Sequence, residues 1–201
     1  MIKNIVFDIG GVLVDFMPEK LMRQAGMPEN KLEAWMKASV RSKWWPEMDR
    51  GFFKEEELLR FMQEDSPEFS KELAWFMEIG KREVVESFDY SEGWLKGLKE
   101  RGYHNYLLTN YPDSFFEIHS RESFTFMPYV DGQIVSAVVE LIKPDPNIYR
   151  ILLKTYGLKA EECVFIDDRR ENVETAKKLG FHGICFESFE QATAQLEELI
   201  S

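Results

Sequence analysis

The chain has 201 residues, the length of one domain or of one domain with a sizeable insertion. Lys and Arg number 25 against 36 Asp and Glu, and the resulting net charge of -11 disfavours nucleic acid or an anionic membrane as the main partner. The two cysteines are too few for a disulfide framework or a thiolate zinc site, and no apolar run approaches the ~20 residues that span a bilayer. We therefore expect a cytoplasmic globular protein with free thiols.

The first predicted element is a strand at residues 5–7, an apolar run that ends in Asp8 and is followed by a Gly-Gly turn. Apolar runs without alternation are typical of parallel strands that are covered by helices on both faces. Asp8 therefore falls at the carboxyl end of a predicted strand.

Residues 17–88 lack a strand pattern, and their apolar residues recur with helical spacing. Leu32, Trp35 and Met36 share one helical face, and similar stripes follow as far as Met77. We predict an all-helical insertion of three to five helices over 17–88, in which most of the Met, Trp and Phe side chains form a small core. Such a module would overhang the carboxyl ends of the strands, where ligands bind in open α/β sheets.

Strand and helix patterns alternate in the rest of the chain. Apolar strand runs are predicted at residues 106–108, 163–166 and 181–186, and a helical stripe precedes each of them. This alternation predicts an α/β fold with a doubly wound, mostly parallel sheet. The core is assigned to residues 1–16 and 89–201.

Polar side chains directly follow three of the predicted strands: Asp8, then Thr109 and Asn110, then Asp167 and Asp168. If the strands are parallel, all of these side chains reach the same edge of the sheet. Carboxylates held close together repel one another, which raises a pKa or recruits a cation, and an all-oxygen site shared with a substrate phosphate suits Mg²⁺. A carboxylate that the metal does not require can attack as a nucleophile.

The order and spacing of these residues resemble the four motifs of the haloacid dehalogenase (HAD) superfamily. The motifs are Phe7-Asp8-x-Gly10-Gly11, Leu108-Thr109-Asn110, Lys143-Pro144-Asp145-Pro146-x-Ile148-Tyr149 and Phe165-Ile166-Asp167-Asp168-x3-Asn172. The resemblance implies a Rossmann-like core, and the insertion looks like the small helical cap of subfamily I. The chain is most similar to the branch that contains α-D-glucose-1-phosphate phosphatase and the N-terminal phosphatase domain of soluble epoxide hydrolase.

This resemblance implies a Mg²⁺-dependent phosphatase that acts on a small phosphorylated metabolite, such as a sugar phosphate, through an aspartyl-phosphate. Asp8 would be the nucleophile and a metal ligand. Thr109 would donate a hydrogen bond to a phosphoryl oxygen, and Lys143 would neutralise charge on the nucleophile and the phosphate. Gly11 and Asn110 would contact the substrate, and the protein would be a monomer or a weak homodimer.

The resemblance also assigns the remaining metal ligands. Asp168 and the backbone carbonyl of Gly10 would bind Mg²⁺ directly, and Asp167 would reach it through water. Phosphatases of the superfamily usually carry an Asp at the position of Gly10 as general acid and base, and that help is typically worth about 10²–10⁴-fold. We therefore expect slow turnover of poor leaving groups, unless a group from the insertion or from the substrate takes over this role. Asn172 also lies at a position where members of the superfamily commonly carry an acid, so the site of this chain has one negative charge fewer.

A basic and aromatic cluster in the insertion is the candidate for substrate specificity. Arg41, Trp44 and Trp45 would bind a sugar or nucleotide-sized leaving group by stacking and hydrogen bonding, and Asp49 follows them. The alternative, that these side chains pack the insertion or face solvent, stays open.

Three other functions remain open from the sequence. A 2-haloacid dehalogenase would use the same attacking Asp without a metal, but the Asp167-Asp168 pair favours a metal. A phosphomutase is less favoured, because that reaction demands the acid–base residue that is absent at Gly10. A regulatory module that binds phosphate and Mg²⁺ with little turnover would also accommodate Gly10.

Overall fold

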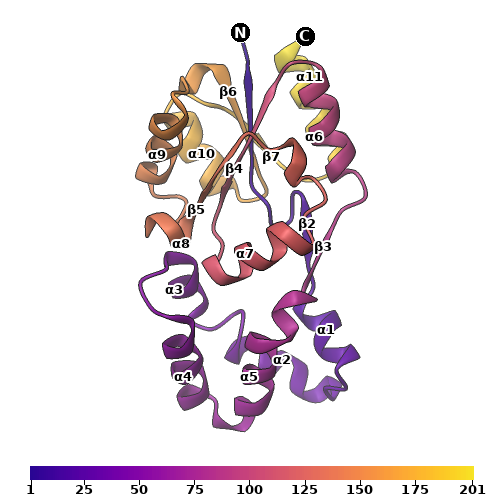
Figure 1. Cartoon of the computed structure of the whole chain (residues 1–201), viewed down its shortest axis with the longest axis vertical. Helices are drawn as coiled ribbons and strands as arrows, with labels where there is room; N and C mark the ends of the chain where they lie inside the picture. Colours follow the sequence, from indigo (N-terminus) through magenta and orange to yellow (C-terminus); the bar gives the residue numbers. More distant parts are fainter.

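The computed structural model describes all 201 residues and centres on a five-stranded sheet (Figure 1). The strands lie in the order β5-β4-β1-β6-β7, and every neighbouring pair is parallel. The prediction of an α/β fold with a doubly wound, mostly parallel sheet is confirmed. The five strands are β1 (Asn4–Phe7), β4 (His104–Thr109), β5 (Gly132–Val135), β6 (Cys163–Asp167) and β7 (His182–Cys185).

Helices cover both faces of the sheet, because successive side chains of a strand point to opposite faces. Ile5 and Phe7 belong to the apolar core shared with α6 and α11, whereas Val6 belongs to the core shared with α9 and α10. Figure 1 shows these two helix pairs on opposite sides of the strands. The helices of this part of the chain are α6 (Ser91–Glu100), α7 (Asp113–Glu122), α8 (Ser136–Val139), α9 (Pro146–Tyr156), α10 (Arg170–Lys178) and α11 (Phe189–Ile200).

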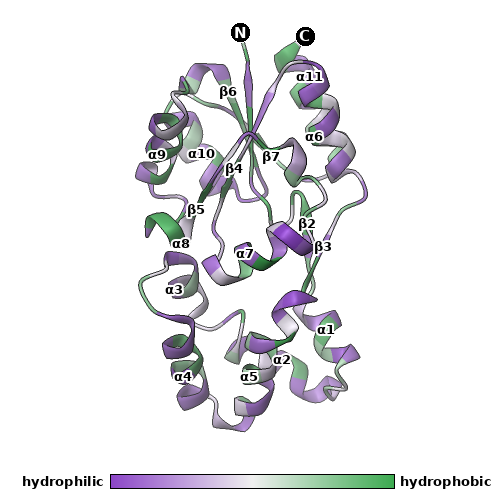
Figure 2. Cartoon of the chain, in the orientation of Figure 1, coloured by the Kyte–Doolittle hydropathy of each residue, from purple (hydrophilic) through white to green (hydrophobic).

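Five further helices follow β1 in the chain and lie below the sheet in Figure 1. We call them the helical insertion; its edges are β2 (Val14–Phe16) and β3 (Val85–Ser87), which pair as an antiparallel ribbon. Trp35 and Phe76 are buried inside it, with ring centroids 5.3 Å apart, and the hydrophilic and hydrophobic colours of Figure 2 alternate along its helices, as expected of amphipathic elements. The helices are α1 (Pro18–Gln24), α2 (Glu29–Ala38), α3 (Trp45–Arg50), α4 (Glu55–Asp65) and α5 (Ser70–Glu78).

The sequence patterns did not reveal three of the strands. β2 and β3 have three residues each, which is too short for an alternation to be recognised. β5 lies at the edge of the sheet and begins with the half-buried Gly132 and Gln133, so it lacks the continuous apolar run of the inner strands. None of the helices combines the length and the apolar composition of a membrane-spanning segment.

The helical insertion touches the core where α3 meets α8. Gly51 ends α3 with a φ of 74°, and a Cβ atom placed on it would lie only 2.1 Å from the carbonyl oxygen of Ala137. The Ser136 hydroxyl donates a hydrogen bond of 2.6 Å to the backbone carbonyl of Asp49. Glycine at position 51 is therefore required both by the backbone conformation and by the close approach of the two helices.

Replacing Gly51 with Ala is expected to lower the free energy of unfolding through both effects. Gly26→Ala is the matched control, because Gly26 also has a positive φ but no atom within 4 Å of a Cβ placed on it. The left-handed conformation costs Ala about 1–2 kcal/mol in both variants, and overpacking against Ala137 should add about 1–3 kcal/mol in Gly51→Ala alone. Urea denaturation measures both values, and equal losses would contradict the close contact between α3 and α8.

Candidate active site

Three carboxylates converge at the carboxyl edge of the sheet. Asp8 follows β1, Asp167 ends β6 and Asp168 comes next, and β1 and β6 are neighbours in the sheet. One oxygen from each carboxylate lies within 4.8 Å of the others. The predicted convergence of these side chains is therefore observed, and the backbone explains it, because the Asp8 amide donates to the Ile166 carbonyl at 2.9 Å.

Lys143 supplies the positive charge at the centre of this cluster. Its Nζ lies 2.8 Å from Asp8 and 2.7 Å from Asp167, and its side chain is only 1% exposed. Burial raises the pKa of Asp8 to about 6. The positive charge of Lys143 counteracts this rise, and the negative charge of Asp167 adds to it. Burial alone would lower the pKa of Lys143, but the charges of Asp8 and Asp167 outweigh it and raise that pKa. Lys143 therefore stays protonated and compensates two buried carboxylates.

Asp167 is held by donors on several sides. Besides Lys143, it accepts hydrogen bonds from the backbone amide of Arg169 at 2.8 Å and from the Asn172 side-chain amide, at 3.0 Å to each oxygen. Asp167 is fully buried, so these donors occupy the faces from which a ligand would approach. Asp168 differs, because it is exposed, although burial of its carboxyl and repulsion by Asp167 raise its pKa. The geometry leaves Asp8 and Asp168 as the more open carboxylates of the three.

Thr109 is the last residue of β4 and Asn110 follows it, and the two side chains have different surroundings. The Thr109 hydroxyl is buried and has no hydrogen-bond partner in the protein. An orphaned buried hydroxyl is costly, so it points to a ligand that would satisfy it. Asn110 instead uses both ends of its amide on the backbone of Lys143, accepting from its N–H at 2.7 Å and donating to its carbonyl at 3.0 Å. Asn110 thus fixes the loop that carries Lys143, and its predicted contact with substrate stays a prediction.

The two glycines after Asp8 leave space for the carboxylates. Gly11 has a φ of 72°, and a Cβ atom placed on it would approach an Asp168 carboxylate oxygen to 3.0 Å. A side chain at this position would push Asp168 away from Asp8. Gly10 has open space on its side-chain face, with no atom within 4 Å.

A compact pocket of about 120 Å³ opens over Asp8. Elements of the core and of the helical insertion line it together, which places residues far apart in the sequence around one carboxylate. We call it the Asp8 pocket, and its lining comprises Asp8, Gly10, Val14, Phe16, Trp45, Asp49, Asn110, Tyr111, Pro112 and Phe115.

Only one of the three candidate specificity residues lies at this pocket. Trp45 lines it and meets Phe115 edge to face, with centroids 5.7 Å apart. Trp44 stacks on Phe61 inside the helical insertion, and its indole N–H donates to Asp65 at 2.9 Å. Arg41 forms ion pairs of 2.8 Å with Glu19 and Glu33 on the exposed surface. The structure therefore does not bring Arg41 and Trp44 to the candidate site.

Asp49 lies at the Asp8 pocket, although no role was predicted for it from the sequence. Burial, reinforced by the charge of Asp8, raises the pKa of Asp49 to about 7. The available signal was its spacing from Trp45, because residues four apart share one face of a helix. Only the structure shows which face of α3 turns toward the core.

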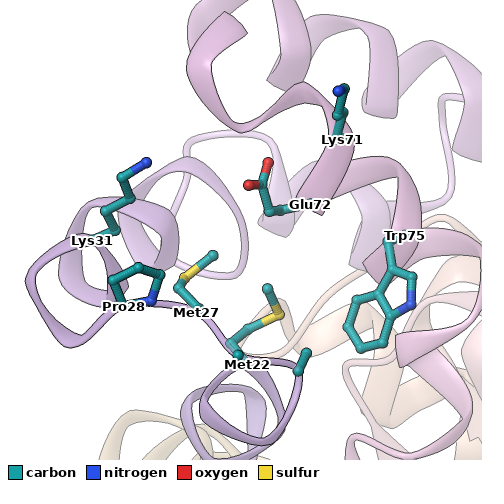
Figure 3. Close-up of a pocket in the computed structure, with 9 residues that line it drawn as sticks. Met22, Met27, Pro28, Lys31, Lys71, Glu72 and Trp75 are labelled. Carbon is teal, nitrogen blue, oxygen red and sulfur yellow. The ribbon is translucent and has the colours of Figure 1, made fainter.

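A larger pocket of about 440 Å³ lies within the helical insertion (Figure 3). It is bordered by Met22, Met27 and Trp75, with Lys31 and Lys71 at its rim. None of the predicted site residues lines it, and it has no carboxylate cluster like that around Asp8. It is not the site of the chemistry that the sequence predicts.

The residues present fit a hard divalent cation. The converging donors are carboxylate oxygens, with an unpartnered hydroxyl beside them and a buried ammonium to limit the negative charge. Oxygen-only sites of this kind suit Mg²⁺. The family comparison supports the same reading, because a profile of haloacid dehalogenase-like hydrolases matches residues 2–180. The chain belongs to the HAD-like hydrolase family.

Relatives of this HAD-family hydrolase include two proteins named as phosphatases. It is 28% identical over 198 residues to D-ribitol-5-phosphate phosphatase from Bacteroides thetaiotaomicron, with 90% of each chain covered. It is 30% identical over 159 residues to flavin mononucleotide hydrolase 1 from Arabidopsis thaliana, and 28% identical over 183 residues to mouse bifunctional epoxide hydrolase 2. The matches cover 77% and 88% of this chain, but only 61% and 32% of those two longer proteins. The predicted similarity to the epoxide hydrolase branch is confirmed.

Solved structures share the fold of this HAD-family hydrolase. A HAD-family enzyme from Bacteroides thetaiotaomicron, solved in complex with magnesium and inorganic phosphate, superposes with a TM-score of 0.75. The two chains are 21% identical, and the match covers 97% of this chain and 99% of the other. The likeness extends over nearly the whole chain, including the helical insertion.

Proposed function

We propose that this protein is a Mg²⁺-dependent phosphatase that hydrolyses a small phosphorylated metabolite, such as a sugar phosphate, through a phosphoryl group carried on Asp8. The observation that carries the proposal is the set of groups at one sheet edge. Asp8 lies beside two further carboxylates, the buried ammonium of Lys143 and the unpartnered hydroxyl of Thr109. Phosphoryl transfer needs mainly positioning and charge neutralisation, which is what these groups supply.

Each residue has a distinct part in this reaction. An Asp8 carboxylate oxygen attacks phosphorus, Lys143 holds that carboxylate at 2.8 Å and offsets its charge, and the Thr109 hydroxyl donates to a phosphoryl oxygen. When bound, Mg²⁺ would neutralise charge that develops on the phosphoryl oxygens. Asp8, Asp168 and the Gly10 carbonyl would hold it, next to an Asp167 fixed by Lys143 and Asn172.

The relatives support phosphate chemistry over dehalogenation. Two relatives named as phosphatases, one of them D-ribitol-5-phosphate phosphatase, match this chain over 90% or more of its length. A dehalogenase of this fold needs one attacking carboxylate and no metal, so it gives no reason to gather Asp167 and Asp168 around Asp8. The compact pocket with Trp45 at its wall favours a small organic leaving group.

A panel of phosphorylated metabolites tests the proposal. We expect phosphate release from at least one small sugar or polyol phosphate in the presence of Mg²⁺. Excess EDTA should abolish it, and added Mg²⁺ should restore it. The proposal is wrong if no ester is hydrolysed, or if the protein instead releases halide from 2-haloacids in EDTA.

A further inference from the structure

Breaking the P–O bond of an ordinary phosphate ester needs a proton for the departing oxygen. An alkoxide is a poor leaving group, and proton transfer from a positioned acid typically speeds such steps by about 10²–10⁴-fold. Gly10 has no side chain that could donate, so the proton must come from another group at the Asp8 pocket.

Two of the titratable groups near Asp8 are committed elsewhere. The ring of Tyr111 lines the pocket, but its hydroxyl lies 2.8 Å from Nδ1 of the buried His119. Burial also raises the pKa of the Tyr111 hydroxyl above its ordinary value. Lys143 is bonded to both Asp8 and Asp167, so the loss of its proton would leave two buried carboxylates uncompensated. Neither group is free to exchange a proton with a substrate.

Asp49 is the remaining titratable side chain at the pocket besides Asp8. It enters from α3, across the pocket from the sheet edge, and it forms no ion pair. Asp49 and Asp8 line the same pocket of about 120 Å³, so a phosphate ester bound over Asp8 would lie next to Asp49. The burial of Asp49 and its repulsion by Asp8 favour its protonated form.

The backbone around Asp49 is fixed against the core. Its carbonyl accepts a hydrogen bond from the Ser136 hydroxyl, and that hydroxyl in turn accepts from the Tyr111 amide at 2.9 Å. Two residues later, Gly51 packs directly on Ala137. Tyr111 follows the Thr109-Asn110 pair, so one hydroxyl ties Asp49 to the segment that borders Asp8.

We propose that Asp49 is the general acid and base of this enzyme, taking the part that Gly10 cannot play. As an Asp8 oxygen bonds to phosphorus, the bond from phosphorus to the leaving oxygen breaks and that oxygen takes the proton of Asp49. The Asp49 carboxylate then accepts a proton from the water that attacks phosphorus and releases Asp8. Ester and water thereby become alcohol and phosphate, and both aspartates return to their starting states. This inference rests on the proposed phosphatase function.

The experiment compares wild type with Asp49→Asn on phosphate esters whose leaving groups differ in basicity, with Mg²⁺ present. An alkyl phosphate needs a proton donor, whereas p-nitrophenyl phosphate releases a stabilised phenolate. We expect kcat/KM of Asp49→Asn to fall by about 10²–10³-fold on the alkyl ester and by less than about 10-fold on the p-nitrophenyl ester. A purely structural role would lower both alike.

Two further variants sharpen the comparison. Glu47→Gln is the matched control, because Glu47 is a half-buried acid on the same helix that pairs with Arg50 at 3.5 Å and does not line the pocket. It should keep wild-type values on both esters. Adding Gly10→Asp to Asp49→Asn should recover about tenfold or more on the alkyl ester, because the side-chain face of Gly10 is open.

The outcomes separate this inference from the proposed function. If wild type hydrolyses both esters and Asp49→Asn, correctly folded by circular dichroism, loses equally on both or on neither, Asp49 is not the proton donor and the phosphatase proposal stands. If wild type hydrolyses no phosphate ester, the proposed function fails and this inference fails with it.

Discussion

Phosphate release is expected to fall on the order of 10⁴-fold or more when Asp8 is replaced by Asn, with little change in the fold. The amide lacks the negative charge and the nucleophilic oxygen that attack on phosphorus requires. It is nearly isosteric with the carboxylate, and its oxygen is able to accept the bond that Lys143 now makes to Asp8 at 2.8 Å. Steady-state phosphate release with saturating Mg²⁺ measures the first effect, and circular dichroism checks the second.

Asp15→Asn serves as the control for this change. Asp15 lies in β2 close to Asp8 in sequence, but it is exposed and does not line the Asp8 pocket. It should retain activity within a small factor of wild type. Full Mg²⁺-dependent activity in Asp8→Asn would show that another group accepts the phosphoryl group, and it would overturn the assignment of Asp8.

The sheet edge was predictable from the sequence because one rule of geometry governs it. Asp8, Thr109 and Asp167 each come at the end of a buried apolar run, and parallel strands bring such ends together. No knowledge of side-chain packing is needed for that step. The register between β1 and its two neighbours, β4 and β6, is enough to place all three residues around one point.

The contribution of the helical insertion was not predictable in the same way. Trp44 and Trp45 are adjacent, yet one packs on Phe61 and the other lines the Asp8 pocket. Successive residues of a helix point about 100° apart, so the rotation of α3 decides which of them reaches the core. α3 packs against the core where Gly51 meets Ala137, and this contact joins residues distant in the sequence.

Asn110 and Asn172 show a second limit of sequence reasoning. The sequence predicted that Asn110 contacts the substrate and that Asn172 removes a negative charge, but it did not reveal the hydrogen bonds that both side chains make to other site residues. Asn110 holds the backbone of Lys143, and Asn172 donates to both oxygens of Asp167. A polar side chain near a site can orient the residues that meet the ligand, and its hydrogen-bond partners show this role where the sequence does not.

Removing the ammonium of Lys143 should have the largest effect on stability. Lys143→Met leaves Asp8 and Asp167 buried, 12% and 0% exposed, without their shared counter-charge. Breaking a buried ion pair on one side costs about 3–5 kcal/mol, so the free energy of unfolding in EDTA should fall by that amount. Lys3→Met is the control, because its pair with Glu162 is at the surface and should be worth less than about 1 kcal/mol.

A double variant separates the loss of charge from the loss of packing in Lys143→Met. Adding Asp167→Asn removes one of the two uncompensated carboxylates, while the Arg169 amide keeps an oxygen to bond. Urea denaturation should then show recovery of part of the lost stability, because the penalty came from buried charge. We expect no phosphate release from Lys143→Met or from the double variant, because Asp8 lacks its Lys143 partner in both. A double variant no more stable than Lys143→Met would mean that Lys143 acts mainly by filling space.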